Sequence, residues 1–210
     1  MWCSYTAYQC ISKLLGRSLS KRPNLLLPRI STRHINIGTD FVTIRDATKD
    51  DCDQIMELVQ EFSESQKLSD QVKINADVLK KDGFGDEPLF RCKIAEISDS
   101  GKSEKRKIVA YGLYFFTYST FEGRMLYIED VYVKTPWNGQ GLGTMIWKDI
   151  AKIAVETDCQ RMQWTVLNSN QTAIEMCKKR GAVDLTLTEK WHLMRMRRRE
   201  LEVFANIPEL

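Results

Sequence analysis

Two adjacent acids, Glu129 and Asp130, interrupt an otherwise apolar run that reads as a strand from Met125 to Val133. An ionised side chain in such a run costs free energy unless the protein or a ligand uses it. Side chains alternate along a strand, so neighbouring acids point to opposite faces unless a bulge redirects one of them. At least one carboxylate is therefore expected to face a cleft or the interior. A half-exposed edge strand with two solvated acids is the alternative.

A glycine-rich turn, Asn138 to Gly143, follows this strand and opens an amphipathic helix. The N-terminus of a helix offers unpaired N–H groups and a partial positive charge of roughly half a unit to an anion. Glycines at 139, 141 and 143 allow a tight turn and the close approach of a phosphate group. The order of strand, loop and helix predicts a phosphate-bearing cofactor, although helix starts also use glycine merely to turn.

The spacing of these glycines excludes two common nucleotide-binding motifs. The Walker A motif GxxxxGK[ST] is absent, and the dinucleotide fingerprint GxGxxG belongs after the first strand of its domain. What remains is a GxGxG loop in the middle of a domain, after a run of antiparallel strands.

The elements that must position this loop follow from hydrophobic periodicity. The helix after the loop places Ile146, Ile150 and Ile153 on one face. Other helices are expected near 50–62, 76–81 and 171–180, and strands at 41–45, 89–97, 108–118, 125–133, 161–167 and 191–196. This order predicts an α/β fold of mixed α+β type, with one mixed, mostly antiparallel sheet, helices on both faces and a βαβ crossover.

The charge of the chain is divided unevenly. The first 39 residues hold six basic residues and no acid, which leaves 25 basic against 28 acidic residues in the body of the protein. The body therefore gives no reason to expect a nucleic acid partner. No run of 18 apolar residues exists, so no membrane span is expected either.

The segment 1–39 is basic, free of acids, rich in serine and dotted with apolar residues, which is the composition of a mitochondrial transit peptide. A leader without a targeting role, on a cytoplasmic protein, is the alternative. The chain is thus divided into this leader, a globular domain at 40–200 and a tail at 201–210. Six cysteines without a CxxC pair, and only two histidines, favour free thiols in a reducing compartment over a zinc site.

The loop Asn138-Gly139-Gln140-Gly141-Leu142-Gly143 resembles the pyrophosphate loop [RQ]xxGx[GA] of the GCN5-related N-acetyltransferase (GNAT) superfamily. Several other segments resemble the spermidine/spermine acetyltransferase family, and in particular its thialysine (diamine) acetyltransferase branch: KLSDQVKI (67–74), DGFGD (82–86), YSTFEGR (118–124), YIEDVYV (127–133) and WH (191–192). The similarity covers about residues 41–196. It implies the GNAT fold, acetyl-CoA as cosubstrate without a metal, a small amine substrate and a homodimer.

The resemblance also assigns the cofactor contacts. The backbone of 131–133 would pair with the pantetheine arm and supply an N–H to the thioester oxygen, and 139–144 would hold the phosphates. Asn170 would contact the cofactor and can also cap the helix that follows it. The implied cofactor-binding residues are Val131, Tyr132, Val133, Asn138, Gly139, Gln140, Gly141, Leu142, Gly143, Thr144, Asn170, Gln171, Thr172 and Ala173.

Amine acetylation requires that a protonated amine, with a pKa near ~10, lose a proton before it attacks the thioester. By resemblance, Glu129 is the base that takes this proton, and Asp130 is its neighbour in the amine site. The general acid of the family is a tyrosine whose aligned position here is Cys177. The implied amine-binding residues are Ser65, Gln66, Ser119, Glu129, Asp130, Gln163, Trp164, Thr165, Glu189 and Trp191.

The sequence departs from the family at three places. A thiol at Cys177, with an ordinary pKa of ~8.5, can protonate a departing thiolate but reaches less far than a phenol, so a small helix residue without a catalytic role is an equal alternative. Asn138 replaces the usual Arg or Gln of the loop. Ser119 and Gln66 replace acids that hold polyamines, which should penalise spermine more than a small diamine or thialysine.

Two readings from other classes stay open. A non-catalytic acyl-CoA-binding or regulatory protein would keep the glycine loop and lack the general acid, as Cys177 indicates. A protein lysine acetyltransferase would need a cleft that admits a peptide, against which the bulky stretch YFFTYSTFE (114–122) argues weakly.

Overall fold

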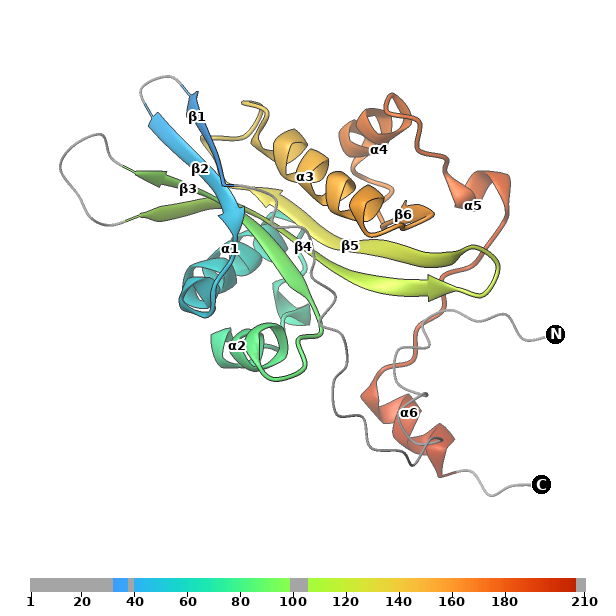
Figure 1. Ribbon diagram of the computed structural model, residues 1–210. Coiled ribbons are helices and arrows are strands. Elements are labelled where there is room, and N and C mark those ends of the chain that lie inside the picture. Colours follow the sequence, from blue (N-terminus) through green and yellow to red (C-terminus); the bar gives the residue numbers. More distant parts are fainter. Residues whose placement is uncertain (1–31, 38–39, 99–105, 207–210) are drawn as a thin grey trace, which may run out of the picture. The chain divides into compact units, whose positions relative to one another are not determined.

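The computed structural model describes residues 32–37, 40–98 and 106–206. They form two compact units, the first ending at Trp164 and the second beginning at Thr165. The first unit contains one sheet with the strand order β1-β2-β3-β4-β5-β6 (Figure 1). Its strands are β1 (Arg33–Ile37), β2 (Asp40–Asp46), β3 (Arg91–Ser98), β4 (Lys107–Ser119), β5 (Gly123–Val133) and β6 (Arg161–Gln163).

Neighbouring strands run antiparallel except β5 and β6, which are parallel and are joined through α3 (Leu142–Glu156). Helices α1 (Cys52–Ser65) and α2 (Ala76–Phe84) cover one face of the sheet, and α3 covers the other (Figure 1). Two short 3₁₀ helices, Lys49–Asp51 and Ser69–Gln71, flank α1. The predicted mixed sheet, with helices on both faces and a βαβ crossover, is confirmed.

The apolar stripes predicted on the helices form the two cores. Ile146 and Ile150 of α3 are fully buried and Ile153 nearly so, in a cluster with residues of β2 to β5. Ile55 and Leu58 of α1 are buried in a second cluster on the other face of the sheet. Burial of such side chains stabilises the fold by about 1.5–3 kcal/mol each. The sheet is therefore held from both sides at β4 and β5.

Strand β1 is an element that the sequence did not predict, and it lies within the range assigned to the leader. Its Arg33 donates a hydrogen bond of 2.7 Å to the carboxylate of Asp149, which is 1% exposed on α3. A buried carboxylate needs such a partner, since an isolated charge away from water is costly. Residues 1–31 and 38–39 of that range lie outside the described residues.

Two predicted strands differ from the structure. The strand expected at 161–167 is limited to Arg161–Gln163, and the segment 191–196 contains neither a strand nor a helix. In the latter segment Leu193 and Met194 are 73% and 85% exposed, so these adjacent apolar side chains bury neither face. The alternation of a half-buried strand is therefore missing, and the prediction of a closing strand was wrong.

The second unit contains three short helices: α4 (Gln171–Lys178), α5 (Leu185–Thr188) and α6 (Arg198–Ala205). None of them contains a buried residue.

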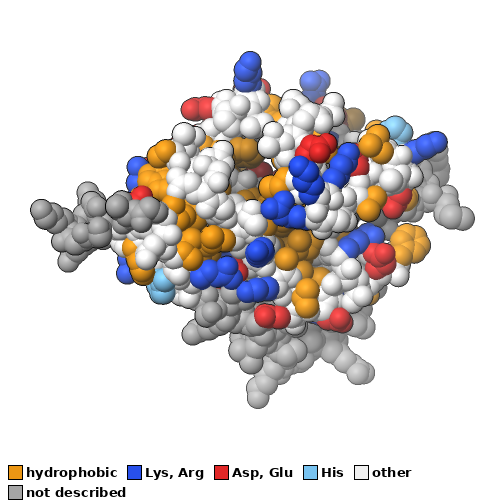
Figure 2. Space-filling view, turned by 90° about the horizontal axis from the view of Figure 1, so that it is seen from above, with side chains coloured by type: hydrophobic (Ala, Val, Ile, Leu, Met, Phe, Trp, Pro, Cys, Tyr) orange, Lys and Arg blue, Asp and Glu red, His pale blue; other side chains and the backbone are white. Residues whose placement is uncertain are grey.

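On the face of the molecule shown in Figure 2, acidic and basic side chains are interspersed with apolar ones. Within the described residues, no helix is both long enough and apolar enough to cross a membrane.

Candidate active site

Glu129 and Asp130 lie at a β-bulge in β5. Across the ladder, Leu113 of β4 is opposite Asp130 and the next residue, Tyr114, is opposite Ile128. Glu129 is therefore the additional residue that β5 carries relative to its partner strand. Bulges of this kind redirect side chains and are common next to active sites.

The bulge exchanges the faces that the side chains of β5 occupy. Leu126 and Ile128 belong to the α3 cluster before the bulge, and Val131 and Val133 pack against the same cluster after it. Asp130 consequently lies on the opposite face, toward α1. In a regular strand Asp130 would point into the apolar cluster beneath α3, where a carboxylate has no partner.

The two carboxylates differ in their surroundings. Asp130 is half-buried, and its pKa is raised to about 6, first by burial and second by the negative charge of Glu129. Glu129 is exposed. The expectation that at least one acid faces inward is thus confirmed for Asp130. A pKa near neutrality suits a group that takes up a proton in catalysis.

The edge of β5 that faces away from β4 is open beside these acids. β6 pairs with β5 only from Met125 to Tyr127. From Ile128 to Val133, no strand of the described residues covers this edge. An exposed strand edge offers backbone N–H and C=O groups to an extended ligand. The predicted contact of residues 131–133 with a ligand arm is consistent with this geometry.

The glycine-rich loop leads from β5 into α3. Gly139 has φ +79° and Gly141 has φ +88°, and these are conformations that residues with a Cβ rarely adopt. Gly141 directly precedes α3, and its carbonyl accepts the first hydrogen bond of the helix from Met145, at 3.0 Å. No acidic residue lies in the first turn of α3. The helix start can therefore receive an anion through the N–H groups of its first turn.

The side chains of the loop make local contacts. Asn138 accepts a hydrogen bond of 2.8 Å from the N–H of Gly139, and Gln140 donates one of 3.0 Å to the carbonyl of Pro136. The indole of Trp137 donates to Asp40 at 3.3 Å and packs against the α3 cluster. The loop is thus anchored to the sheet, and Asn138 engages one of the backbone donors that the sequence predicted for phosphate.

Three predicted amine-binding residues lie at chain turns of the first unit. Ser65 ends α1 and is exposed, and Gln66 follows it and donates to its hydroxyl at 3.1 Å. The hydroxyl of Ser119 is buried and accepts hydrogen bonds from the N–H groups of Phe121 and Glu122. Ser119 therefore stabilises the turn between β4 and β5, and its contact with an amine stays a prediction.

Gln163 and Trp164 end the first unit. Gln163 is the last residue of β6 and lies opposite Tyr127 of β5. The indole of Trp164 is half-buried and meets Trp147 of α3 edge to face, with 4.7 Å between ring centroids. This contact places Trp164 against the α3 cluster, so it supports the packing of the crossover helix.

The second unit carries the remaining predicted residues. The side chain of Asn170 accepts from the N–H of Ala173 at 3.1 Å, which confirms that it caps α4. Cys177 is a free, half-buried thiol in α4. Glu189 accepts a hydrogen bond of 2.6 Å from the indole of Trp191, so this predicted pair is brought together. Thr165 is exposed at the start of the unit.

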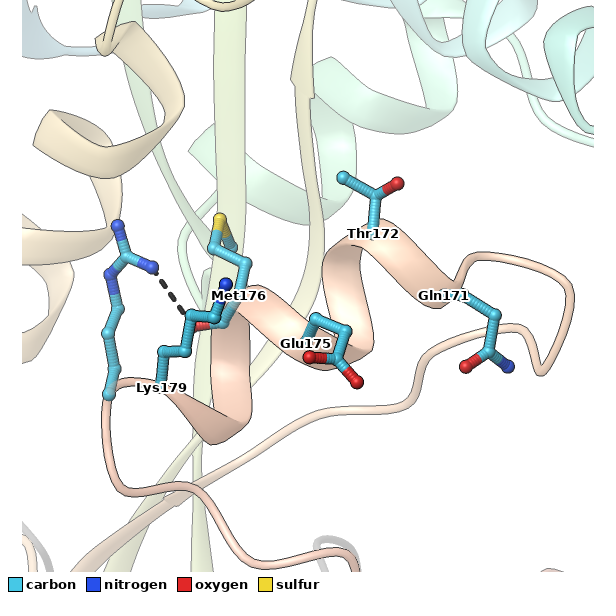
Figure 3. A pocket seen from close by; sticks show the side chains of 6 residues that line it. Gln171, Thr172, Glu175, Met176 and Lys179 are labelled. Carbon is cyan, nitrogen blue, oxygen red and sulfur yellow. Dashed lines mark hydrogen bonds between the residues drawn. The ribbon is translucent and has the colours of Figure 1, made fainter.

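A shallow depression runs along α4 (Figure 3). Among the predicted cofactor-binding residues it includes Gln171 and Thr172. Neither carboxylate of β5 contributes to it. Its lining is Gln171, Thr172, Glu175, Met176, Lys179 and Arg180.

Sequence reasoning missed Glu61, which joins α1 to β5. Glu61 accepts hydrogen bonds from the hydroxyl of Tyr132, at 2.9 Å, and from Lys134, at 2.5 Å. The ammonium of Lys134 is the main reason that the pKa of Glu61 is lowered. Burial, and then the bond to Glu61, raise the pKa of Tyr132 to about 12. The signal in the sequence was the position of Glu61. This acid lies on α1 between Val59 and Phe62, two residues of the apolar face of the helix.

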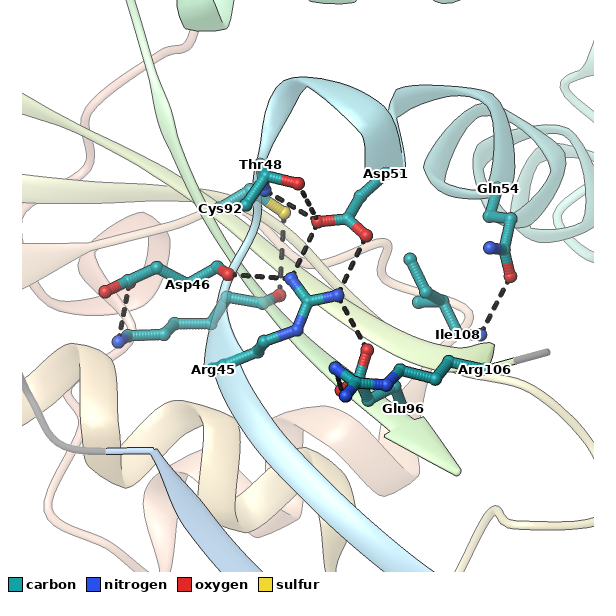
Figure 4. Close-up of polar contacts among 10 residues, drawn as sticks. Arg45, Asp46, Thr48, Asp51, Gln54, Cys92, Glu96, Arg106 and Ile108 are labelled. Carbon is teal, nitrogen blue, oxygen red and sulfur yellow. Dashed lines mark hydrogen bonds and ion pairs between the residues drawn. The ribbon is translucent and has the colours of Figure 1, made fainter. Parts of the chain in front are cut away.

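The start of α1 is fixed by a second polar group (Figure 4). Arg45 of β2 donates to both oxygens of Asp51, at 2.7 and 2.9 Å, and to Glu96 of β3 at 2.6 Å. Asp51 also accepts from the backbone and the hydroxyl of Thr48. Burial opposes the charge of Asp51, but the bonds from Arg45 and Thr48 leave its pKa lowered. α1, and with it Glu61, is held in place on the sheet.

The described residues include a glycine-rich helix start and an unpaired strand edge that lies beside two carboxylates. These features define a class of protein that can hold a phosphate-bearing cofactor next to a proton acceptor. Within the part of the chain that the structure describes, no three His, Cys, Asp or Glu side chains gather so that they could hold a metal ion.

Comparison with known proteins identifies the family. Residues 53–182 match the acetyltransferase (GNAT) family. The chain is 46% identical to thialysine N-epsilon-acetyltransferase of Bos taurus over 74% of its own length and 92% of that protein. It is 40% identical to the spermidine/spermine N(1)-acetyltransferase-like protein 1 of Homo sapiens, over 77% of this chain and 23% of that protein. The chain belongs to the GNAT acetyltransferase family, as its loop predicted.

Solved structures agree with this fold. An integron cassette protein of V. cholerae is 22% identical and superposes with a TM-score of 0.63, over 79% of this chain and 98% of that one. An aminoglycoside acetyltransferase from a soil metagenomic sample is 15% identical, with a TM-score of 0.56 over 74% and 94% of the two chains. The predicted GNAT fold is confirmed.

Proposed function

We propose that this protein transfers the acetyl group of acetyl-CoA to the primary amine of a small diamine or a lysine-like substrate such as thialysine. The observation that carries the proposal is the placement of the Glu129–Asp130 pair at a bulge of β5, in the stretch that β6 leaves unpaired and that leads into the glycine-rich start of α3. The relatives at 44–46% identity that are named thialysine N-epsilon-acetyltransferases support the choice of amine.

The residues of the chain fit acetyl-CoA. The positive φ angles of Gly139 and Gly141 turn the loop so that backbone amides at the start of α3 can hold the diphosphate. The open edge from Ile128 to Val133 can pair with the amide groups of the pantetheine arm. When bound, acetyl-CoA supplies an activated thioester. Those N–H groups of 131–133 that point away from β4 could donate a hydrogen bond to the thioester oxygen.

The carboxylate pair performs the proton chemistry in this proposal. Asp130 and Glu129 attract the cationic amine and take up one of its protons, which leaves a lone pair on nitrogen for attack at the thioester carbon. The C–N bond forms, the C–S bond breaks, and the sulfur leaves as a thiolate that accepts a proton. Cys177 is the proposed donor of that proton, with water as the alternative source, because a CoA thiolate and a cysteine have similar basicity.

The choice of amine follows from charge. A long polyamine needs several acids to offset the desolvation of its charges. Gln66 is neutral, and the hydroxyl of Ser119 is engaged in a turn, so these positions offer no carboxylate. Glu189, which binds the indole of Trp191, is the one acid of the second unit that we assign to the amine site. We therefore expect a preference for thialysine and small diamines over spermidine and spermine.

The direct test measures thiol release from acetyl-CoA with thialysine, lysine, putrescine, spermidine and spermine. The expected result is the highest kcat/KM for thialysine or a small diamine. A higher kcat/KM for spermine would overturn the substrate choice, and background release with every amine would overturn the proposed activity.

A non-catalytic acyl-CoA-binding protein is the second candidate. The half-buried Cys177, at the position where the family has a tyrosine, favours it. Calorimetric titration with coenzyme A separates the candidates in combination with the thiol-release assay: binding without turnover supports the second one. A protein lysine acetyltransferase would instead show turnover with a lysine-containing peptide and none with thialysine.

We also propose a homodimer, as the resemblance implies, and import into mitochondria through the leader. Sedimentation of the purified protein tests the first statement. Fluorescent fusions with and without residues 1–31, a deletion that keeps β1, test the second, and a cytoplasmic location of both fusions would contradict it.

A further inference from the structure

Tyr111 of β4 carries a hydroxyl that the proposed mechanism does not use. Its side chain is fully buried in the cluster between the sheet and α1. Among the described residues, its hydroxyl has no hydrogen-bond partner. Buried polar atoms are nearly always paired, because an unpaired buried hydroxyl destabilises the folded state. A phenylalanine would fill the same space without this cost. A function of the hydroxyl would explain why a tyrosine is present at this position.

The strand register places Tyr111 on the same face as Asp130. Tyr111 is opposite Tyr132, and Asp130 is opposite Leu113, so Tyr111 and Asp130 occupy diagonal positions of the antiparallel pair. Diagonal neighbours on one face lie within reach of an aromatic side chain. The rings of Tyr111 and Tyr132 are 6.4 Å apart between centroids, which confirms that both point to this face.

The bulge at Glu129 creates this arrangement. Without the additional residue, Asp130 would lie on the α3 face and Tyr111 would have no acid beside it. The neighbouring hydroxyl of Tyr132 is already bonded to Glu61, at 2.9 Å. Of these two tyrosine hydroxyls, that of Tyr111 is the one without a partner among the described residues.

We propose that Tyr111 is a positioning residue for acetyl transfer, whose hydroxyl donates a hydrogen bond to the Asp130 carboxylate during the reaction. A rotation of the Asp130 side chain toward β4 brings the two groups together. The bond stabilises the ionised carboxylate and holds it in one orientation toward the substrate ammonium. This inference rests on the proposed function.

The electrostatic surroundings support the pairing. Burial is the main reason that the pKa of Tyr111 is raised, and the negative charge of Asp130 is the next. Tyr111 thus stays a neutral donor at every pH of interest. The other titratable groups that act on it are Glu129 and Tyr132 of β5 and Cys92 of β3, and α1 contributes Glu61 through Tyr132.

The test replaces Tyr111→Phe, which removes only the hydroxyl. The control is Tyr114→Phe on the same strand, because Tyr114 is equally buried but faces the α3 cluster. We expect Tyr111→Phe to lower kcat/KM for thialysine by about tenfold, as for a lost hydrogen bond to a charged group. We also expect it to move the acidic limb of the pH profile to higher pH. Tyr114→Phe should change neither.

A double substitution isolates the action through Asp130. In an Asp130→Asn background, Tyr111→Phe should cause no further loss, since the carboxylate that it positions is gone. A full additional tenfold loss in that background would overturn the proposal, as would wild-type kinetics of the single variant.

A measurement on the wild-type protein makes the test independent of both the variants and the amine. Carbon-detected NMR follows the Asp130 carboxyl carbon and the ring Cζ of Tyr111 as pH is varied. The proposal expects the Cζ shift to titrate with the same apparent pKa as the carboxyl. A flat Cζ shift overturns it. If the wild type turns over no amine, the proposed function fails, while this titration still decides whether the two groups are bonded.

Discussion

The two units of this protein hold the two halves of the proposed chemistry, and they differ in how those halves are supported. Glu129, Asp130 and the glycine-rich loop lie on β5 and at the start of α3, between two buried clusters. Cys177 lies on α4, which like α5 and α6 contains no buried residue. Binding and deprotonation are thus assigned to residues beside a packed core, whereas protonation of the leaving group is assigned to a helix without a buried residue.

This difference is consistent with the demands of each step. Removing a proton from an amine and aligning it with a thioester need groups held within a fraction of an ångström. A thiolate leaves with little assistance, so its proton donor tolerates a looser position. Substitution of the two carboxylates or of the glycines of the loop should therefore have larger effects than substitution of Cys177.

The largest effect is expected for the carboxylate pair. Glu129→Gln and Asp130→Asn should each lower kcat/KM for thialysine by about 10²–10⁴-fold, as is typical when acid–base catalysis is lost. The same assay on Glu156→Gln, an exposed acid at the end of α3, is the control and should show wild-type rates. Near-normal activity of both carboxylate variants would show that neither acid removes the proton from the amine.

The second effect concerns stability and its dependence on pH. The pKa of Asp130 is raised to about 6 from an ordinary value of 3.8, so the folded state binds the proton more tightly than the unfolded state. The ionised carboxylate therefore destabilises the fold, and this cost develops as pH rises from about 4 to 6 and is complete above that. Allowing for partial exposure, Asp130→Asn should raise the free energy of unfolding by about 2 kcal/mol at pH 8.

Urea unfolding at pH 8 and pH 4 measures this gain, which should be nearly absent at pH 4. An equal gain at both pH values would show that the substitution acts through packing and not through charge. Stability and activity should thus move in opposite directions in Asp130→Asn, as is common for groups that serve a reaction at the expense of the fold.

The third effect is on the loop. Gly141 has φ +88°, and an alanine there is strained by about 1–2 kcal/mol, which corresponds to roughly tenfold weaker binding if the loop distorts. Gly123→Ala is the matched control, because Gly123 has φ +93° but is the first residue of β5, at the other end of that strand from the loop. Calorimetry with coenzyme A should show the loss in Gly141→Ala alone. Equal losses in both would trace the effect to general destabilisation.

The fourth effect concerns the second unit. Cys177→Ala should lower kcat by about fivefold, less than is usual for a general acid, because the CoA thiolate is a competent leaving group. Cys177→Tyr, which restores the residue of the family, should equal or exceed the wild-type rate. The control is Cys159→Ala, which removes a half-buried thiol from the first unit. Unchanged rates in Cys177→Ala would show that Cys177 has no catalytic role and is only a small residue of the helix.

Most of the first unit could be predicted because its helices and strands show strong periodicity. The stripe Ile146, Ile150 and Ile153 indicated the buried face of α3 directly. β1 was missed because Arg33–Ile37 lies in a basic, acid-free stretch whose composition resembles that of a leader. Tertiary pairing with β2, and the ion pair with Asp149, determine its structure, and neither is visible in a local pattern.

The sequence proposed residues for the site, but it could not supply their geometry. Adjacent acids indicated that a bulge was conceivable, but only the register shows that Glu129 is the additional residue. A sign existed in the sequence: the apolar positions 126 and 128 are followed by 131 and 133, which breaks the two-residue period between them. Which of the two acids is half-buried depends on this break, and so does the raised pKa of Asp130.

The smallest effect is expected at Asn138, where the first unit itself departs from its family. The side-chain oxygen of Asn138 accepts the N–H of Gly139 at 2.8 Å and competes with a phosphate for that donor. Asn138→Ala should therefore tighten the binding of coenzyme A by about two- to threefold, since a released neutral hydrogen bond is worth roughly 0.5 kcal/mol net. Pantetheine, which lacks the phosphates, is the control ligand, and its affinity should not change. If both ligands gain affinity equally, the contact shapes the loop as a whole and does not compete with phosphate.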